Sequence, residues 1–216
     1  KAMNQDLRRY KRLKMFVHAE ESNPTIPLND GDVSVFIRMG TDFNDNYYEY
    51  EVPLKVTPAG FYNTENSANE NDREIVWPES NNIDLKFSLL TEMKMLRNSL
   101  LNDPNSNVLI IKPFEQKDGN NTIRIKGNPN LANVKVFMIG IRNPKQSNSN
   151  LADDDGLSKC AEVWVNELRM TDFDNEGGWA TRGRLTAQLA DLGTLTLAGA
   201  YSTPGFGSVD QKLNQL

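Results

Sequence analysis

The sequence predicts an all-β protein: a jelly-roll-like β-sandwich with one amphipathic helix, followed by a C-terminal β-hairpin. Segments that alternate apolar and polar residues recur along the chain, and this period of two turns one face of a strand toward a core. Stretches rich in Asn, Asp and Gly separate these segments and are typical of turns. One long segment instead repeats its apolar residues at helical spacing.

The first half of the chain predicts three strands. Alternation is clear in Leu13–Glu20 and strongest in Val33–Met39, and it resumes in Tyr47–Val56 after a polar loop. The second and third strands should therefore form an antiparallel hairpin. Pro53 places the third strand at a sheet edge or at its own end, because proline cannot donate to a ladder. Gly60–Asp72 is polar and without periodicity, which indicates a surface loop.

The helical pattern lies in Ile83–Leu101. Five apolar residues recur there every three or four positions and form one stripe for packing against a sheet: Leu85, Leu89, Met93, Leu96 and Leu100. Asn82 is a fair N-cap, and Asn102-Asp103-Pro104 ends the helix. An alternative stays open at the beginning, because Ile83–Leu89 also alternates and can start as a strand.

Four further strands are expected before the hairpin. They are Val108–Ile111, Thr122–Lys126, Val134–Ile141 and the strand that opens at Cys160. Val134–Ile141 is apolar on both faces, so we expect it to be central in its sheet. The strand at Cys160 follows a polar loop and closes the sandwich.

The C-terminal part of the chain predicts a hairpin. Gly183–Asp191 and Thr194–Ser202 alternate apolar and polar residues, and only Leu192 and Gly193 separate them. A connection this short needs a residue with positive φ, which Gly193 supplies. We therefore divide the chain into a sandwich domain, residues 1–175, and a C-terminal hairpin and linker, residues 176–216.

Charge and composition exclude several classes of protein. The 24 basic and 29 acidic residues give a net charge of −5, which argues against nucleic-acid binding. One basic cluster precedes the first strand, and a solvated surface is favoured over phosphate binding there: Arg8, Arg9, Lys11, Arg12 and Lys14. No apolar run reaches the roughly 18 residues of a membrane helix. The chain begins with Lys1, so the lack of a signal peptide says nothing about export.

No motif assigns a catalytic, cofactor-binding or metal-ligating residue. His18 is the only histidine and has no nucleophile motif beside it, and the single cysteine, Cys160, is expected to be a buried thiol. Oxygen-rich clusters are interpreted as solvated turns, with a structural calcium site as the weaker alternative. They are Asp42-Asn44-Asn46, whose EF-hand match fails at Tyr47 and Pro53, then Asp153–Asp155, and Asp172, Asp174, Glu176 and Gly177.

Carboxylates and aromatic residues on the expected strands leave two further possibilities open. A glycosidase needs a converging carboxylate pair, and nothing singles out two among Glu49, Glu51, Glu162 and Glu167. Aromatic side chains could line a sugar-binding face, although core packing explains them equally well: Phe36, Tyr47, Tyr48, Tyr50, Trp77 and Trp164. A carbohydrate-binding jelly-roll module on the cell surface is therefore the alternative function.

Several motifs in order carry a resemblance to a known family. They are VSVFIRMGTDFNDNYYEYEVPL, VWVNELRMTDFDNEGGWA, LADLG and YSTPGFGSVDQKL. Together they resemble the SprA family, also called Sov, whose members are giant outer-membrane proteins of Bacteroidetes. These proteins act as translocons of the type IX secretion system and serve gliding motility. The resemblance spans most of the chain and implies a fragment of a very large β-barrel.

The resemblance also implies a role. It implies a non-catalytic, extramembranous domain without a cofactor, exposed to the periplasm or the cell surface, that serves protein export by structural shaping or partner docking. The implied partners are other parts of the same barrel, a PorV-type outer-membrane protein, a plug protein and secreted cargo. The hairpin from Gly183 to Ser202 has the length and alternation of a membrane strand pair, with Trp179 and Tyr201 at its ends. A soluble sheet edge would look similar.

Overall fold

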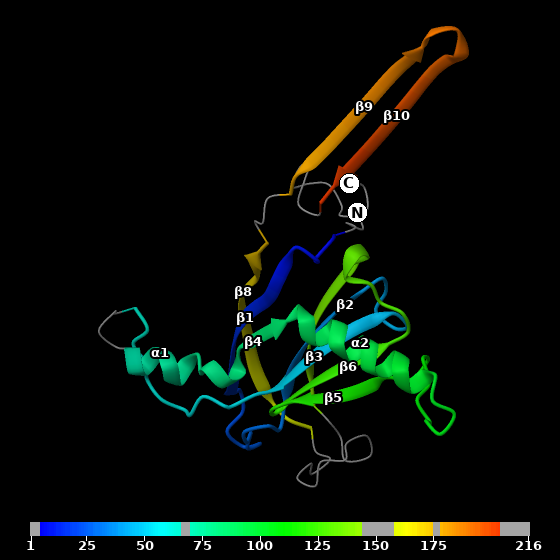
Figure 1. Ribbon diagram of the computed structural model, residues 1–216. Helices are drawn as coiled ribbons and strands as arrows, with labels where there is room; N and C mark the ends of the chain where they lie inside the picture. Colours follow the sequence, from blue (N-terminus) through cyan, green and yellow to red (C-terminus); the bar gives the residue numbers. More distant parts are fainter. Residues whose placement is uncertain (1–4, 66–69, 144–157, 175–177, 204–216) are drawn as a thin grey trace. The chain divides into compact units, whose positions relative to one another are not determined.

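Two antiparallel β-sheets make up the first of the two units into which the chain divides, Lys1–Phe173 and Asp174–Leu216 (Figure 1). The structure is a computed structural model and describes residues 5–65, 70–143, 158–174 and 178–203. The smaller sheet has the strand order β4-β1-β8, and the larger has the order β5-β6-β3-β2-β7. The strands are β1 Tyr10–Glu21, β2 Ser34–Gly40, β3 Tyr47–Pro53, β4 Ile83–Lys86, β5 Phe114–Asp118, β6 Asn121–Lys126, β7 Val136–Arg142 and β8 Ala161–Phe173.

The strand pairing is nested, and the two sheets confirm the predicted all-β sandwich. β1 pairs with β8, β2 with β7 and β3 with β6, each antiparallel. The chain therefore folds back on itself as a long double strand, as jelly rolls do. Two adjacent pairs depart from a strict jelly roll, because β2–β3 and β5–β6 are hairpins within one sheet. The predicted hairpin of the second and third strands is thus confirmed.

The core lies between the two sheets. Alternate residues of β1, β2 and β3 point inward and join one buried apolar cluster, as the period of two predicts: Leu13, Met15, Val17, Ala19, Val35, Ile37, Met39, Tyr48, Tyr50 and Val52. Burying each large side chain contributes roughly 1.5–3 kcal/mol. The two sheets are held together mainly by this apolar contact.

The long helix is shorter than its predicted segment. Ile83–Lys86 forms strand β4, and helix α2 runs over Phe87–Leu101, so the alternative of an initial strand is confirmed over its first four residues. The N-cap is Lys86 instead of Asn82. The buried stripe is Phe87, Leu90, Met93 and Arg97, and Leu96 of the predicted stripe is exposed. Pairing of β4 with β1 explains the difference, because it fixes where the helix can begin.

Two strand predictions in the second half are wrong. Val108–Ile111 forms no strand, and its Leu109, Ile110 and Ile111 are exposed in a turn. Val134–Ile141 overlaps β7, which lies at the edge of its sheet and not at the centre. The outer face of β7 is apolar because the ring of Phe36 packs against it at Gly140. A Cβ on Gly140 would lie only 2.4 Å from that ring. Gly140 gives that ring the room to lie over β7.

Strand β8 contains a β-bulge that the alternation of residues in the sequence does not predict. Phe16 pairs with Asn166 and Lys14 with Arg169, so Glu167 and Leu168 together lie opposite Met15. Glu167 has φ 55°, as an inserted residue in a strand can. The bulge shifts the register of the second half of β8 along β1.

A second helix and the hairpin complete the described structure. Helix α1, Glu70–Val76, begins in the last three residues of the segment predicted as a surface loop and extends beyond it. Strands β9, Ala180–Leu189, and β10, Gly193–Ser202, form the predicted hairpin, joined by a 3₁₀ turn at Ala190–Leu192. Gly193 has φ 127°, as predicted for this corner. Within the described residues, no helix has the length and apolar character needed to cross a membrane.

Two aspartate substitutions test the placement of the core. Val35→Asp puts an unpaired charge at a fully buried position, which should lower the free energy of unfolding by several kcal/mol. Val163 on edge strand β8 is only half-buried, so Val163→Asp should destabilise the protein by less. Urea denaturation followed by circular dichroism measures both. Equal free energies of unfolding for the two variants would contradict this placement.

Candidate functional site

The outward face of the larger sheet carries a set of paired charges instead of a neutral polar surface. We define the ion-pair layer as Arg38 of β2, Glu49 and Glu51 of β3, Arg124 of β6 and Arg142 of β7. The strand register creates it, because Glu49 lies directly between Arg38 on one neighbouring strand and Arg124 on the other. Directly opposed residues of opposite charge stabilise an antiparallel pair.

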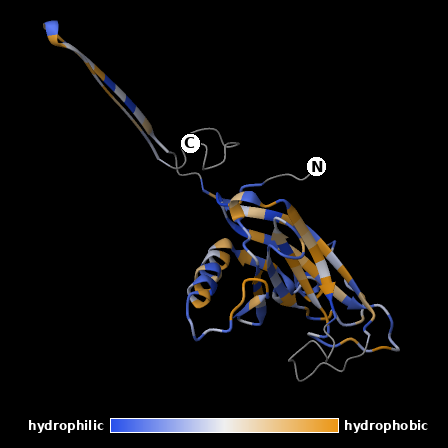
Figure 2. Ribbon diagram, turned by 90° about the vertical axis from the view of Figure 1, so that its right-hand side faces the viewer, coloured by the Kyte–Doolittle hydropathy of each residue, from blue (hydrophilic) through white to orange (hydrophobic). Residues whose placement is uncertain are grey.

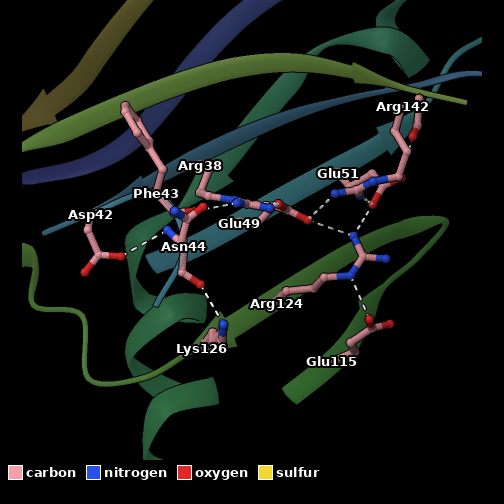
Figure 3. Close-up of polar contacts among 11 residues, drawn as sticks. Arg38, Asp42, Phe43, Asn44, Glu49, Glu51, Glu115, Arg124, Lys126 and Arg142 are labelled. Carbon is pink, nitrogen blue, oxygen red and sulfur yellow. Dashed lines mark hydrogen bonds and ion pairs between the residues drawn. The ribbon is translucent and has the colours of Figure 1, made fainter. Parts of the chain in front are cut away.

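Glu49 is the centre of the ion-pair layer (Figure 3). Its side chain has 0% exposure, although it points away from the core. Arg38 donates to Glu49 Oε2 from Nε and Nη2 at 2.8 and 2.6 Å. Arg124 and Arg142 donate to Oε1 at 2.9 and 3.0 Å. Both carboxylate oxygens of this buried group are therefore paired.

Glu51 and the aromatic rings complete the layer. Arg124 and Arg142 also donate to Glu51, as does the Ser34 hydroxyl. The Arg38 guanidinium lies 3.9 Å from the ring centroid of Tyr47. The Arg142 guanidinium lies 4.6 Å from the ring centroid of Phe36. These rings and guanidinium planes cover the carboxylates and exclude water from them.

Electrostatic interactions within the layer favour the ionised forms of Glu49 and Arg124. Burial raises the pKa of Glu49, but Arg142 and Arg38 lower it by more, so its pKa lies below the usual value. Burial lowers the pKa of Arg124, and its hydrogen bonds to Glu115 and Glu51 raise it by more. A carboxylate held in this way is neither a proton donor nor an exposed base at neutral pH. The arrangement cross-links four strands.

The structure separates the four glutamates that the sequence offers. Glu49 and Glu51 come together, but guanidinium groups saturate both. On the smaller sheet, Glu162 accepts from Trp164 Nε1 at 2.6 Å, and Glu167 accepts from Arg169 at 2.8 Å. Sequence reasoning missed the arginines of the layer. Opposite charges do occur at the outward positions of β2, β3 and β6, but the sequence shows that they pair only when the strand register is known.

Most of the aromatic residues considered for a sugar-binding face are buried in the core or lie against arginine side chains. Tyr48 and Tyr50 are buried in the core, with hydroxyls on the Pro129 carbonyl at 3.2 Å and Asp118 at 2.8 Å. Burial raises the pKa of Tyr48 to about 12. Phe36 and Tyr47 lie under the arginines of the layer. Only Trp164 among the six is clearly exposed, at 57%, and one such ring does not make a sugar-binding platform.

His18 and Cys160 occupy positions in the smaller sheet or at its end. His18 is buried, and its Nδ1 lies 2.7 Å from the Val76 carbonyl oxygen and 3.2 Å from Thr57 Oγ1. Its ring contacts those of Trp77 and Trp164. Cys160 is a free thiol that is half-buried and not fully buried as expected, because it precedes an edge strand.

The Asp42 loop has a structural explanation. Asp42 Oδ1 accepts the backbone N–H groups of Asn44, Asp45 and Asn46 at 2.6–3.0 Å, and Oδ2 accepts from the Asn46 side chain at 2.8 Å. These hydrogen bonds hold the pKa of Asp42 well below its usual range. The carboxylate thus closes the β2–β3 turn. Asp153–Asp155, Glu176 and Gly177 lie outside the residues that the structure describes. Among the described residues, no group of three or more His, Cys, Asp or Glu side chains could hold a metal ion.

The hairpin has one apolar and one polar face. Cross-strand pairs place Leu185 opposite Leu197 and Ala187 opposite Leu195, whereas Arg184 lies opposite Ala198 on the other face. Figure 2 shows hydrophobic and hydrophilic residues along each strand. Every residue of β10 is exposed. The rings of Trp179 and Tyr201 lie 5.3 Å apart at the open end.

Comparison with protein families identifies the chain. Residues 1–215 match the model of the SprA_N family, described as motility related/secretion protein. The chain belongs to the SprA_N family. A search of the curated proteins found no match. The resemblance seen in the sequence motifs is therefore confirmed over nearly the whole chain.

Membership of the SprA_N family gives the chain a motility- or secretion-related role. Such a role points to association with the cell envelope. In this chain, side chains with large pKa shifts, such as Asp42 and Arg124, hold turns and strands together.

Glu49→Gln tests whether the ion-pair layer stabilises the sheet. Removing the central charge leaves buried guanidinium groups short of a partner, so the free energy of unfolding should fall by about 3–5 kcal/mol. Because the folded pKa of Glu49 is lowered, its contribution is present above its unfolded value of about 4.5 and lost on acidification. Urea titrations from pH 7 to pH 3 should therefore show a flatter acid limb for Glu49→Gln. As control, Glu115→Gln removes an exposed partner of Arg124 and should cost within about 1 kcal/mol; an equal loss would contradict the central role of Glu49.

Chelation and Asp42→Ala together test the turn. We expect EDTA to leave the melting temperature unchanged, because the Asp42 oxygens are already hydrogen-bonded within the loop. Asp42→Ala should lower stability by about 1–2 kcal/mol with or without calcium. Asp45→Ala, whose side chain is 76% exposed, is the matched control and should have little effect. A fall of several degrees with EDTA that calcium restores would instead identify a calcium site.

Proposed function

We propose that this chain is a non-catalytic, extramembranous part of an outer-membrane translocon of the type IX secretion system. It serves protein export and gliding motility by shaping the export path or by docking partners. Family membership supports the general role. The observation that carries the finer proposal is the exposed, two-faced hairpin β9–β10.

The geometry of the hairpin supports a place in a larger sheet. Each strand has 10 residues, and about 9–11 residues suffice for a strand that spans a bilayer. One face presents leucines and the other presents arginines, threonines and a glutamine, as expected for a strand pair between lipid and a polar interior. An isolated two-stranded hairpin is marginally stable in water, and its free edges offer unpaired N–H and C=O groups.

The sandwich supports the non-catalytic part of the proposal. Glu49 and Glu51 are the two glutamates that the fold brings closest to an acid–base pair, and both are neutralised by arginines. A catalytic acid needs a raised pKa, whereas that of Glu49 is lowered. We propose that this unit acts as a folded spacer or docking domain outside the bilayer.

The proposed partners come from the hairpin's free edges in the case of the parent barrel, and from the family resemblance alone in the case of the others. The first is the rest of the parent barrel, which would pair with the free edges of β9 and β10. A PorV-type outer-membrane protein, a plug protein and secreted cargo are further proposed partners. The proposed location is the outer membrane, with the sandwich on its periplasmic or outer side.

Amide hydrogen exchange of the full chain tests the hairpin. In dilute aqueous solution, amides of β9 and β10 should exchange orders of magnitude faster than those of β1–β3, because few contacts oppose their opening. Dodecylphosphocholine micelles should slow exchange in β9 and β10 by covering the leucine face. Leu195→Lys with Leu197→Lys should abolish that protection.

The control changes the opposite face of the same strand. Thr194→Lys with Thr196→Lys adds the same two charges beside Arg184 and Gln188 and should leave micelle protection in place. Equal loss of protection in both double variants, or slow exchange in water alone, would contradict a two-faced hairpin that belongs to a larger sheet.

A further inference from the structure

A basic pocket lies between the beginning of β1 and the beginning of α2, within the first unit. Its volume is about 470 Å³, within the roughly 300–1,000 Å³ typical of small-molecule sites. Cationic side chains from two distant segments meet there: Arg8, Lys11, Arg12 and Lys86. The fold thus joins part of the basic cluster near the N-terminus to a residue more than seventy positions further along the chain. One carboxylate, that of Asp172, also lines the pocket.

The two arginines are held in position by partners on one side only. Arg8 donates from Nε and Nη2 to Asp6 at 2.9 and 2.7 Å. Arg12 donates in the same manner to Asp84 at 2.8 and 2.6 Å. Each guanidinium has five N–H donors, so a bidentate pair leaves further donors on each. The arginines are therefore oriented without being saturated by these pairs.

The two lysines add positive charge to the pocket, and of the two only Lys86 is close enough to Asp84 to lower the pKa of that carboxyl. Lys11 and Lys86 form no salt bridge with any residue in the described ranges. Both are exposed, and both line the pocket. Holding like charges together costs free energy, which a bound anion would relieve.

The beginning of α2 adds hydrogen-bond donors to the same pocket. Its N-cap, Lys86, makes no side-chain capping hydrogen bond, and its first turn contains no acidic residue. The first N–H groups of a helix lack intrahelical partners and carry partial positive charge. Ser88 of this turn lines the pocket and offers a hydroxyl group, whereas the hydroxyl of Thr91, one turn further on, donates to the Phe87 carbonyl at 3.4 Å. The helix end reinforces a site that the cationic side chains already define.

An apolar wall completes the pocket and limits the class of ligand. Tyr10, Phe87 and Leu131 line it, and Phe87 and Leu131 belong to the buried core. This wall suits an organic body next to the charged group. We propose that the pocket binds a phosphate monoester, with the phosphate at Lys11, Lys86 and the α2 end and its organic part against Phe87. This site is independent of the proposed secretion role, and a lipid headgroup or a soluble phosphorylated metabolite would provide the same chemistry.

Titration with inorganic phosphate tests the pocket on the full 216-residue chain. We expect saturable amide shifts in two-dimensional NMR at Ser88 and Leu89. Lys11→Ala with Lys86→Ala should weaken binding about fivefold or more, since two charge-assisted contacts are lost. Lys112→Ala with Lys135→Ala removes the same charge from two other exposed lysines and should leave the affinity within about twofold. No shifts at millimolar phosphate, or equal weakening by both double variants, would overturn the proposal.

Asp172→Asn gives a test in the opposite direction. Asp172 has φ 56°, a region that Asn tolerates well, so the fold should be kept. Removing the only carboxylate of the lining should tighten phosphate binding by about twofold or more. Weaker binding in this variant would show that the pocket does not select anions and would overturn the proposal.

Two further ligands distinguish the sources of the phosphate. Glucose 6-phosphate represents a soluble ester, and vesicles of phosphatidylcholine with phosphatidic acid represent a lipid headgroup. Vesicle binding that Lys11→Ala with Lys86→Ala abolishes would assign the pocket to a lipid. Binding of glucose 6-phosphate alone, tighter than inorganic phosphate, would assign it to a soluble ligand.

Discussion

Glu49 carries a carboxylate with no exposed side-chain surface on the outward face of the larger sheet, and the neighbouring strands supply the charges that neutralise it. An isolated buried carboxylate would cost several kcal/mol or take up a proton. Arg38, Arg124 and Arg142 come from three different strands, so the charge is satisfied only when all of them are in register. A slip by one residue would turn these side chains into the core. The ion-pair layer therefore specifies the order and register of the sheet, while the apolar core supplies most of the stabilisation.

The same constraint explains why this face is poorly suited to chemistry and well suited to support. Guanidinium groups and the rings of Phe36 and Tyr47 surround the carboxylates, and the Glu49 side chain has no exposed surface. The turn closed by Asp42 is anchored to the same sheet, because Lys126 donates to the Asn44 carbonyl at 2.7 Å and to Asp45 at 3.0 Å. A sheet fixed on both faces is a rigid element. Such an element fits a spacer or docking domain in a secretion-related protein.

Local patterns in the sequence predicted the strands whose neighbours agree with their alternation. Leu13–Glu20, Val33–Met39 and Thr122–Lys126 each present one face to the core, and their positions were predicted correctly. The errors arise where tertiary contacts decide. Val108–Ile111 has strand-forming residues but no strand to pair with in the described structure, and the apolar outer face of β7 reflects the ring of Phe36 above Gly140. The ion-pair layer could not be predicted from the sequence for the same reason. Its residues are up to 104 positions apart and come together only when the strands pair in this register.

The two units of the chain differ in how far they bury their apolar residues. The sandwich pairs outward charges with one another and buries an apolar cluster between its two sheets, although Phe61 and Ile111 are among the apolar side chains that it leaves exposed. The hairpin pairs only its two strands, and it leaves its leucine face and both outer edges uncovered within the described structure. Leucine burial is worth roughly 1.5–3 kcal/mol per side chain, and four leucines on one face represent a large unsatisfied contribution. This exposed leucine face is the observation behind the proposal that the chain works as part of a larger assembly.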